Sequence, residues 1–180
     1  MPAADNVGRS PVRWRHLTDL DIREKLRYLR GQWRSGRPTL VESGRWPFIL
    51  GWQVATAFHH AKLDPIHLLL GLLDLQAGIA PLVLLAHGFP RHLVWEQISV
   101  LKAETSTSMP PTAVLGAHTE QLIRTAETLS VDLSMHYIGS GHLLLSLLSK
   151  PDGEVHQVLQ QCPIPSDRTR QALIKHYTYS

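Results

Sequence analysis

The heptapeptide His67-Leu68-Leu69-Leu70-Gly71-Leu72-Leu73 returns 75 residues later as His142-Leu143-Leu144-Leu145-Ser146-Leu147-Leu148, with six of seven positions identical. Around this motif, ten of the 28 residues in the window 63–90 match the window 138–165 at the same offset and without a gap. Leucine-rich heptads match by chance, but a gapless run of this length does not. The sequence therefore contains a duplicated unit, and the duplication decides the architecture.

Each unit is predicted to form four helices. In the first unit, Leu50, Val54 and Phe58 share one helical face, and Asp64 followed by Pro65 marks the start of the next helix. The other expected helices span 78–86 and a stretch from residue 90 in the first unit, and about 112–132, 140–148, 153–161 and 165–177 in the second. The expected fold class is all-α, with eight helices in two pseudo-symmetric halves around one core.

The composition agrees with this fold class. The 180 residues include 29 leucines but only 7% aromatic residues, which favours helices packed on helices over a β-sandwich. The single cysteine, Cys162, rules out an internal disulfide and any multi-cysteine metal site, so the default location is the cytoplasm. The run Leu68–Ala86 is apolar but contains Asp74 and Pro81, and two core helices explain it better than a membrane span does.

The charge is distributed unevenly along the chain. Residues 1–45 carry ten Lys and Arg against five Asp and Glu, whereas residues 46–180 carry eight against ten. The N-terminus has no apolar run of the kind found in a secretory signal peptide. A basic N-terminal arm is therefore expected to precede a mildly acidic domain.

The arm is predicted to contain one amphipathic helix that starts near Thr18 and Asp19. Three roles compete for it: docking of the apolar stripe on the repeat domain, binding of an acidic protein partner, or binding of nucleic acid or an anionic membrane surface. From Arg37-Pro38 to Arg45-Trp46-Pro47 the chain is expected to form an extended connector. The apolar stripe is Ile22, Leu26, Leu29 and Trp33, and the neighbouring basic stripe is Arg23, Arg27, Arg30 and Arg34; these arginines and Trp33 are the candidate partner-binding residues.

The eleven histidines raise the question of a metal site. His59 and His60 are adjacent, so on a helix their side chains point about 100° apart and cannot share an ion. His67 and His142 occupy equivalent repeat positions beside leucine runs and are expected to form hydrogen bonds between helices. Since no His-Glu-x-x-His motif and no Cys/His cluster occurs, neither a metal nor a cofactor is expected.

Enzymatic activity is not expected either. A hydrolase would need a nucleophile, a base and an orienting group, and the residues around Cys162 show no such pattern. The preferred interpretation is a partly buried free thiol. A pairing of Cys162 with a histidine that is distant in sequence is the one arrangement that leaves a small hydrolase open.

The duplicated unit resembles the Clp repeat, the N-terminal domain of the Clp/Hsp100 ATP-dependent unfoldases. In that family the capped helix typically begins Ile-Gly-Thr-Glu-His-Leu-Leu-Leu-Gly-Leu, and the two copies here are residues 63–72 and 138–147. The resemblance covers residues 47–178. It divides the chain into an N-terminal extension, 1–46, and a repeat domain with repeats 47–104 and 110–178, joined by a Ser-, Thr- and Pro-rich linker at 103–111.

The resemblance implies a non-catalytic domain that docks substrates or adaptors and is normally fused to AAA+ ATPase rings. No Gly-x-x-x-x-Gly-Lys-[Ser/Thr] phosphate loop occurs in the sequence, so the chain resembles the stand-alone Clp-repeat proteins. The expected function is that of an adaptor or accessory factor, with Clp ATPase or protease subunits or their substrates as partners. The groove between the two halves is the expected docking surface. The alternative is a nucleic-acid or membrane-surface binder that acts through the arginine stripe.

One departure from the family pattern affects ligand choice. In ClpC-type members, the glutamate before the motif histidine of each repeat helps to bind phosphoarginine. The equivalent residues here are Ile66 and Gly141, which cannot form a charge-assisted hydrogen bond with a guanidinium group. The chain is therefore not expected to recognise phosphoarginine in this way.

Overall fold

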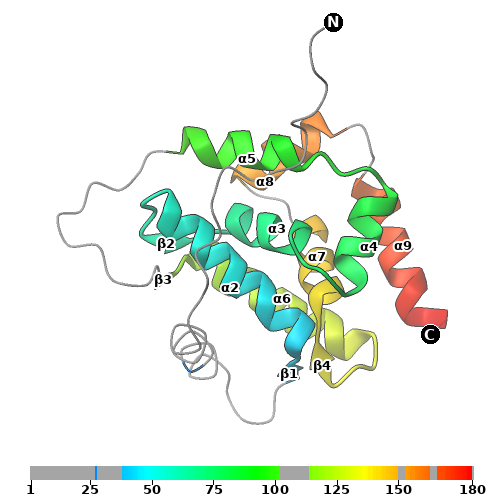
Figure 1. Cartoon of the computed structure of the whole chain (residues 1–180). Coiled ribbons are helices and arrows are strands. Elements are labelled where there is room, and N and C mark those ends of the chain that lie inside the picture. Colours follow the sequence, from blue (N-terminus) through cyan, green and yellow to red (C-terminus); the bar gives the residue numbers. More distant parts are fainter. Residues whose placement is uncertain (1–26, 28–37, 102–113, 150–152, 163–165, 180) are drawn as a thin grey trace, which may run out of the picture.

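The structure, a computed structural model, describes Arg27 and residues 38–101, 114–149, 153–162 and 166–179. These residues form eight helices and four two-residue strands, so the predicted all-α fold with two four-helix repeats is confirmed (Figure 1). The elements are β1 (Thr39–Leu40), α2 (Glu42–Ala57), β2 (Lys62–Leu63), α3 (Pro65–Leu73), α4 (Ile79–Ala86), α5 (Arg91–Val100), β3 (Val114–Leu115), α6 (Ala117–Asp132), β4 (Tyr137–Ile138), α7 (Ser140–Ser149), α8 (Gly153–Gln161) and α9 (Ser166–Tyr179).

The strands connect the two repeats. Strand β1 pairs in parallel with β4, and β2 pairs in parallel with β3, so each short sheet takes one strand from each repeat. The backbone N–H of Val41 donates to the carbonyl of Ile138 at 3.1 Å, and the N–H of Gly116 donates to the carbonyl of Leu63 at 3.0 Å. The two bonds are related by the 75-residue offset. The sequence duplication is therefore a pseudo-two-fold symmetry of the fold.

Side chains at the two strand junctions are complementary in size. A Cβ atom on Gly116 would collide with the carboxylate of Asp64, and a Cβ atom on Gly139 would lie 3.1 Å from the Ser43 hydroxyl and 3.7 Å from a methyl group of Val41. Gly116 occupies the position equivalent to Val41, and Gly139 the position equivalent to Asp64. Each junction thus places one glycine against one larger residue. The glycine follows β3 at the first junction and β4 at the second, so the two junctions have the glycine at non-equivalent positions.

The motif helices α3 and α7 lie at the centre of the molecule (Figure 1). All residues from Ile66 to Leu72 are buried, as are all residues from Ser140 to Leu148. The other helices surround them, with α5 against α8 and α4 against α9 across the repeats. The leucines of the repeated motif therefore lie in the core of the fold, where their burial contributes to the apolar stabilisation.

The single difference between the two motif copies has a packing reason. In repeat one, a Cβ atom on Gly71 would collide with the carbonyl oxygen of Pro47 in α2, so only glycine lets α3 approach this closely. In repeat two, the equivalent Ser146 instead donates its hydroxyl to the carbonyl of Leu122 at 2.7 Å. Leu122 is the counterpart of Pro47. The same backbone carbonyl is therefore contacted in both repeats, once by close packing and once by a hydrogen bond.

Three local expectations were wrong. The segment around Arg45-Trp46-Pro47 is not an extended connector but part of α2, so the expected boundary at residue 46/47 falls inside a helix. Pro47 is the sixth residue of α2, so it removes one backbone hydrogen bond inside the helix, and α2 nevertheless continues to Ala57. The helix expected over about 112–132 begins only at Ala117, after strand β3, and none of the four strands was predicted.

The apolar run 68–86 divides into the end of α3 and all of α4, as expected. Within the described ranges, no helix combines the length and the apolar character that crossing a membrane requires. The predicted linker 103–111 and most of the N-terminal arm lie outside the described residues.

Candidate functional site

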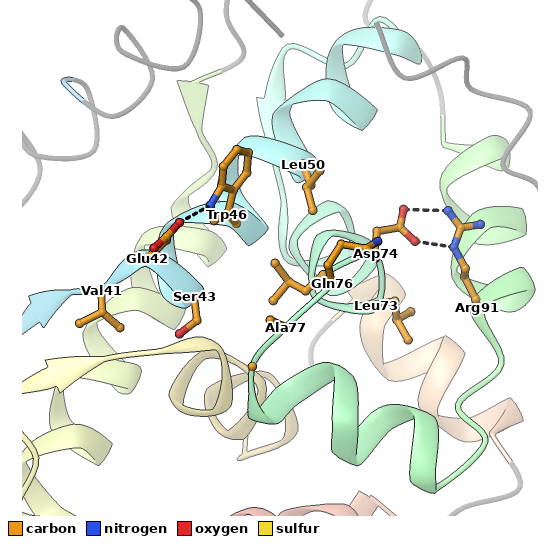
Figure 2. A pocket seen from close by; sticks show the side chains of 12 residues that line it. Val41, Glu42, Ser43, Trp46, Leu50, Leu73, Asp74, Gln76, Ala77 and Arg91 are labelled. Atoms are coloured by element: carbon orange, nitrogen blue, oxygen red, sulfur yellow. Dashed lines mark hydrogen bonds and ion pairs between the residues drawn. The ribbon is translucent and has the colours of Figure 1, made fainter. Parts of the chain in front are cut away.

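A cleft of about 1000 Å³ opens between the N-terminal half of α2 and the loop that joins α3 to α4 (Figure 2). Its walls are mainly apolar: Trp46 and Leu50 come from α2, and Leu73 and Leu75 come from the end of α3 and the loop. All four side chains are partly exposed. The full set of lining residues is Val41, Glu42, Ser43, Trp46, Leu50, Leu73, Asp74, Leu75, Gln76, Ala77, Gly78 and Arg91.

The cleft therefore has the size and lining of a ligand or peptide site. It is lined by residues of repeat one alone, so it is not the groove between the two halves that the sequence led us to expect. Its charged groups stand at its two ends. Figure 2 shows Glu42 beside Trp46 at one end and the Asp74–Arg91 pair at the other.

An ion pair fixes one end of the cleft. Arg91 donates through Nε to one carboxylate oxygen of Asp74 at 2.6 Å and through Nη2 to the other at 2.8 Å. This hydrogen bonding raises the pKa of Arg91 above its ordinary value. The guanidinium carbon also lies 5.8 Å from the centre of the Trp95 ring. Because the bidentate pair joins the loop after α3 to the start of α5, it holds the wall of the cleft in place.

The duplication provides an internal comparison for this cleft. The positions of Trp46 and Leu50 are taken in repeat two by Gln121 and Thr125. Gln121 is exposed, and the Thr125 hydroxyl donates to the Gln121 carbonyl at 3.1 Å. The equivalent wall of repeat two is therefore polar. The apolar α2 wall of the cleft is therefore a property of repeat one and not of the fold.

Helix α4 shows the same asymmetry. Leu82 and Leu85 are 64% and 80% exposed on its outer face. Their counterparts in α8 are Gln157 and Gln160, both exposed. Leu82 and Leu85 therefore give α4 an apolar outer face that α8 lacks.

The motif histidines serve the fold. Nδ1 of His67 accepts the backbone N–H of Asp64 at 3.0 Å, and Nδ1 of His142 accepts the N–H of Gly139 at 3.2 Å. Each histidine therefore caps the first turn of its own helix, and His142 in addition forms the expected hydrogen bond between helices. His142 also lies 3.4 Å from the Tyr177 hydroxyl, which belongs to α9.

Burial keeps both histidines neutral. It lowers the pKa of His67 to about 3, with a further contribution from His60, and it lowers the pKa of His142 to about 4. His59 is exposed and His60 is buried, so the two adjacent histidines face different environments. In the described part of the chain, no group of three or more His, Cys, Asp or Glu side chains is placed to hold a metal ion.

The family's phosphoarginine positions are closed in this chain. The Ile66 side chain is fully buried. A Cβ atom on Gly141 would collide with Ile79 and with the Tyr177 hydroxyl. Neither position faces solvent, so a carboxylate would be buried at both.

The candidate residues of the arm are mostly outside the described part of the chain. Arg27 is described, and it is helical and exposed. Arg23, Arg30, Arg34 and Trp33 are not described, so the partner-binding role of the stripe stays a prediction.

Cys162 is half-buried at the end of α8, and its backbone N–H donates to the carbonyl of Leu159 at 3.2 Å. His87, its counterpart in repeat one, lies across the repeat boundary from Thr169, with 2.8 Å between His87 Nδ1 and the Thr169 hydroxyl.

The cleft residues were not predicted from the sequence. Trp46 and Glu42 fell in the segment taken as a connector, and Leu50 was assigned only to the core face of a helix. One signal was present in the sequence: when the two units are aligned at the 75-residue offset, Trp46 is aligned with Gln121 and Leu50 is aligned with Thr125. A large apolar residue opposite a polar one in a duplicated unit indicates a surface with its own role.

The fold is shared with known proteins. The chain matches solved N-terminal domains of Hsp104 from Candida albicans (TM-score 0.67, 14% identity, 79% of this chain and 93% of that one) and of ClpD from Arabidopsis thaliana (0.59, 18%, 77% and 94%). It also matches a ClpV N-domain solved in complex with a VipB peptide (0.58, 18%, 79% and 86%).

A family model named Clp repeat (R) N-terminal domain matches residues 50–162 and 114–179. The two matches overlap and together span both structural repeats. The chain belongs to the Clp repeat N-terminal domain family.

Proposed function

We propose that this chain is a non-catalytic protein-binding module that receives an apolar peptide or helix in the repeat-one cleft and serves as an adaptor or accessory factor of an ATP-dependent Clp protease or unfoldase. The observation that carries the proposal is the cleft with its one-sided apolar lining. Trp46 and Leu50 keep apolar surface partly exposed where repeat two has Gln121 and Thr125.

The shape and chemistry of the cleft favour a peptide over a small polar metabolite. Its apolar side chains lie along two walls, and its charged groups are confined to the ends, with Asp74 already paired to Arg91. An amphipathic helix or extended apolar peptide bound in a groove uses such a surface. A structural relative, the ClpV N-domain, was solved with a VipB peptide, which supports peptide binding by this fold.

A matched pair of variants tests the proposal. Leu50→Glu places a carboxylate on the cleft wall, and Thr125→Glu places the same group at the equivalent position of repeat two. The full chain and both variants are used as bait in a lysate of the host, and bound Clp ATPase and protease subunits are measured by mass spectrometry. We expect recovery of Clp subunits by the wild type and by Thr125→Glu, and a loss of about tenfold for Leu50→Glu, equivalent to about 1.4 kcal/mol.

Direct binding to purified Clp ATPase then separates an adaptor from a substrate. An adaptor changes the rate at which the protease degrades a second protein and is not itself consumed. Failure of the wild type to recover any Clp subunit, or equal recovery by the two variants, would contradict the proposal.

A further inference from the structure

The cleft opens at the place where the N-terminal arm joins the fold. Val41 and Glu42, which line the cleft, come directly after strand β1, and the chain reaches β1 through Pro38. Strand β1 is fixed by its pairing with β4, where the Thr39 backbone N–H donates to the backbone carbonyl of His136 at 3.1 Å. The residues before Pro38 are therefore tethered beside the mouth of the cleft.

The predicted amphipathic segment 18–34 is close enough in sequence to reach this cleft. It ends four residues before Pro38, where the fixed part of the fold begins, and four residues can span up to roughly 13–14 Å. A helix over 18–34 would itself be about 26 Å long. The connecting residues thus let the segment turn back along the cleft without any change in the repeat domain.

The predicted helix over 18–34 also complements the cleft in polarity and in charge. Its apolar stripe would cover Trp46 and Leu50, whose surfaces are partly exposed. Its arginine stripe lies one step around the predicted helix, where it would face the exposed carboxylate of Glu42 at the cleft end. The apolar stripe of the segment consists of Ile22, Leu26, Leu29 and Trp33.

We propose that residues 18–34 dock in the repeat-one cleft of their own chain, with this apolar stripe against α2 and the α3–α4 loop. Tethering favours this occupant over any free peptide, because a short linker holds a segment at an effective concentration on the order of millimolar. One consequence rests on the function proposed above: a Clp-system partner that uses the cleft has to displace the arm. The docking itself does not depend on that function.

Disulfide trapping tests the docking in the full-length chain. With the native thiol removed by Cys162→Ser, a cysteine is placed on the stripe (Leu29→Cys) together with one on the exposed cleft loop (Ala77→Cys). Each of two controls moves one of the two cysteines. The first combines Ala77→Cys with Glu24→Cys, which lies on the opposite face of the predicted helix. The second combines Leu29→Cys with Gln121→Cys in repeat two.

We expect Leu29→Cys with Ala77→Cys to form an intramolecular disulfide at least about tenfold faster than either control, as a high effective concentration requires. Equal rates in the three proteins would overturn the proposal. A disulfide-linked dimer in place of the intramolecular bond would also overturn it, because the arm would then occupy the cleft of a second copy. Circular dichroism of each variant confirms that the helical fold is retained.

A second measurement needs no disulfide. Leu26→Asp with Leu29→Asp should release the arm and raise the fluorescence of anilinonaphthalene sulfonate, a probe of exposed apolar surface, and adding Leu50→Glu should remove the increase. No increase on release would contradict docking. If the disulfide forms as expected but Leu26→Asp with Leu29→Asp does not change the capture of Clp subunits, the proposed function is refuted and the docking is not. If Clp subunits are captured through the cleft but the intramolecular disulfide does not form, the docking is refuted and the proposed function is not.

Discussion

Nε2 of His67 and Nδ1 of His60 lie 2.8 Å apart in the interior of repeat one. Since Nδ1 of His67 already accepts the Asp64 backbone N–H, the proton of the neutral ring sits on Nε2, which donates to His60. A second proton on His67 would remove the cap of α3 and place a charge in the core. The pair therefore requires His67 to stay neutral.

The stability of the protein is expected to fall in mild acid. The folded state lowers the pKa of His67 to about 3, whereas an unfolded chain titrates near its ordinary value of about 6.5. The stabilising effect is therefore complete above pH 6.5 and is lost as the pH falls from 6.5 toward 3. His67 alone should reduce the free energy of unfolding by about 2 kcal/mol between pH 7.5 and pH 5, and His142 acts in the same direction.

Urea unfolding at several pH values measures this dependence. His67→Gln keeps an acceptor for the Asp64 N–H but cannot titrate, so its stability should change less with pH than that of the wild type. His92→Gln alters an exposed histidine of α5 and should leave the pH dependence unchanged. Equal pH slopes for His67→Gln and the wild type would show that His67 is not responsible.

Restoring the family glutamate in repeat two should damage the fold without creating a phosphoarginine site. Gly141→Glu forces a side chain into the space of Ile79 and Tyr177 and buries a carboxylate. We expect a loss of about 4 kcal/mol or more in the free energy of unfolding, measured by urea denaturation. Ala117→Glu, at the exposed start of α6, should have little effect. Phosphoarginine binding by the wild type at micromolar concentration would contradict the closed-site interpretation.

The Asp74–Arg91 pair should contribute measurably to stability. Arg91→Gln leaves the Asp74 side chain, only 13% exposed, without its bidentate partner. The expected cost is about 1–3 kcal/mol, less than for a fully buried pair because Arg91 is itself 33% exposed. Arg124→Gln breaks an exposed pair with Glu120 whose atoms are 3.6 Å apart, and should cost at most about 0.5 kcal/mol. Similar thermal stabilities for the two variants would exclude a structural role for the pair at the cleft.

The two strand junctions should be interchangeable. Gly116→Val alone places a side chain against the Asp64 carboxylate and should destabilise the protein by about 2 kcal/mol. Combined with Asp64→Gly, it reproduces the pairing of Val41 with Gly139 at the other junction. The double variant should therefore be more stable than the sum of the two single effects predicts, as a double-mutant cycle in urea would show. Strict additivity would mean that the contact between these positions does not decide their identities.

The core could be predicted from the sequence because its signal is repeated. The motif at 67–73 and its copy at 142–148 fixed the central helices, and Asp64-Pro65 marked the start of one of them. The strands could not be predicted, because two residues are too few to show an alternating pattern. Pro47 and nearby glycines favoured a connector, yet packing of α3 against the Pro47 carbonyl keeps this segment helical.

The candidate site was missed, although the alignment of the two units carried one signal for it, at Trp46 and Leu50. The cleft walls come from the misassigned segment, at Trp46, and from the loop after α3, at Leu75. Neither place carries a motif. What distinguishes them is partial exposure of apolar side chains, which depends on the packing of α2 against α3 and is not written in the local sequence.

The strand exchange has a consequence for how such a chain can diversify. Two separate copies of one unit, joined as a two-fold dimer, would form the β1·β4 and β2·β3 pairs as the same isologous contact made twice, and each substitution would appear at both places. Covalent connection keeps the geometry and abolishes that constraint. The surface of one repeat can then become apolar while the equivalent surface of the other repeat stays polar. A single polypeptide thereby has the asymmetry of a heterodimer without the need for two chains to associate.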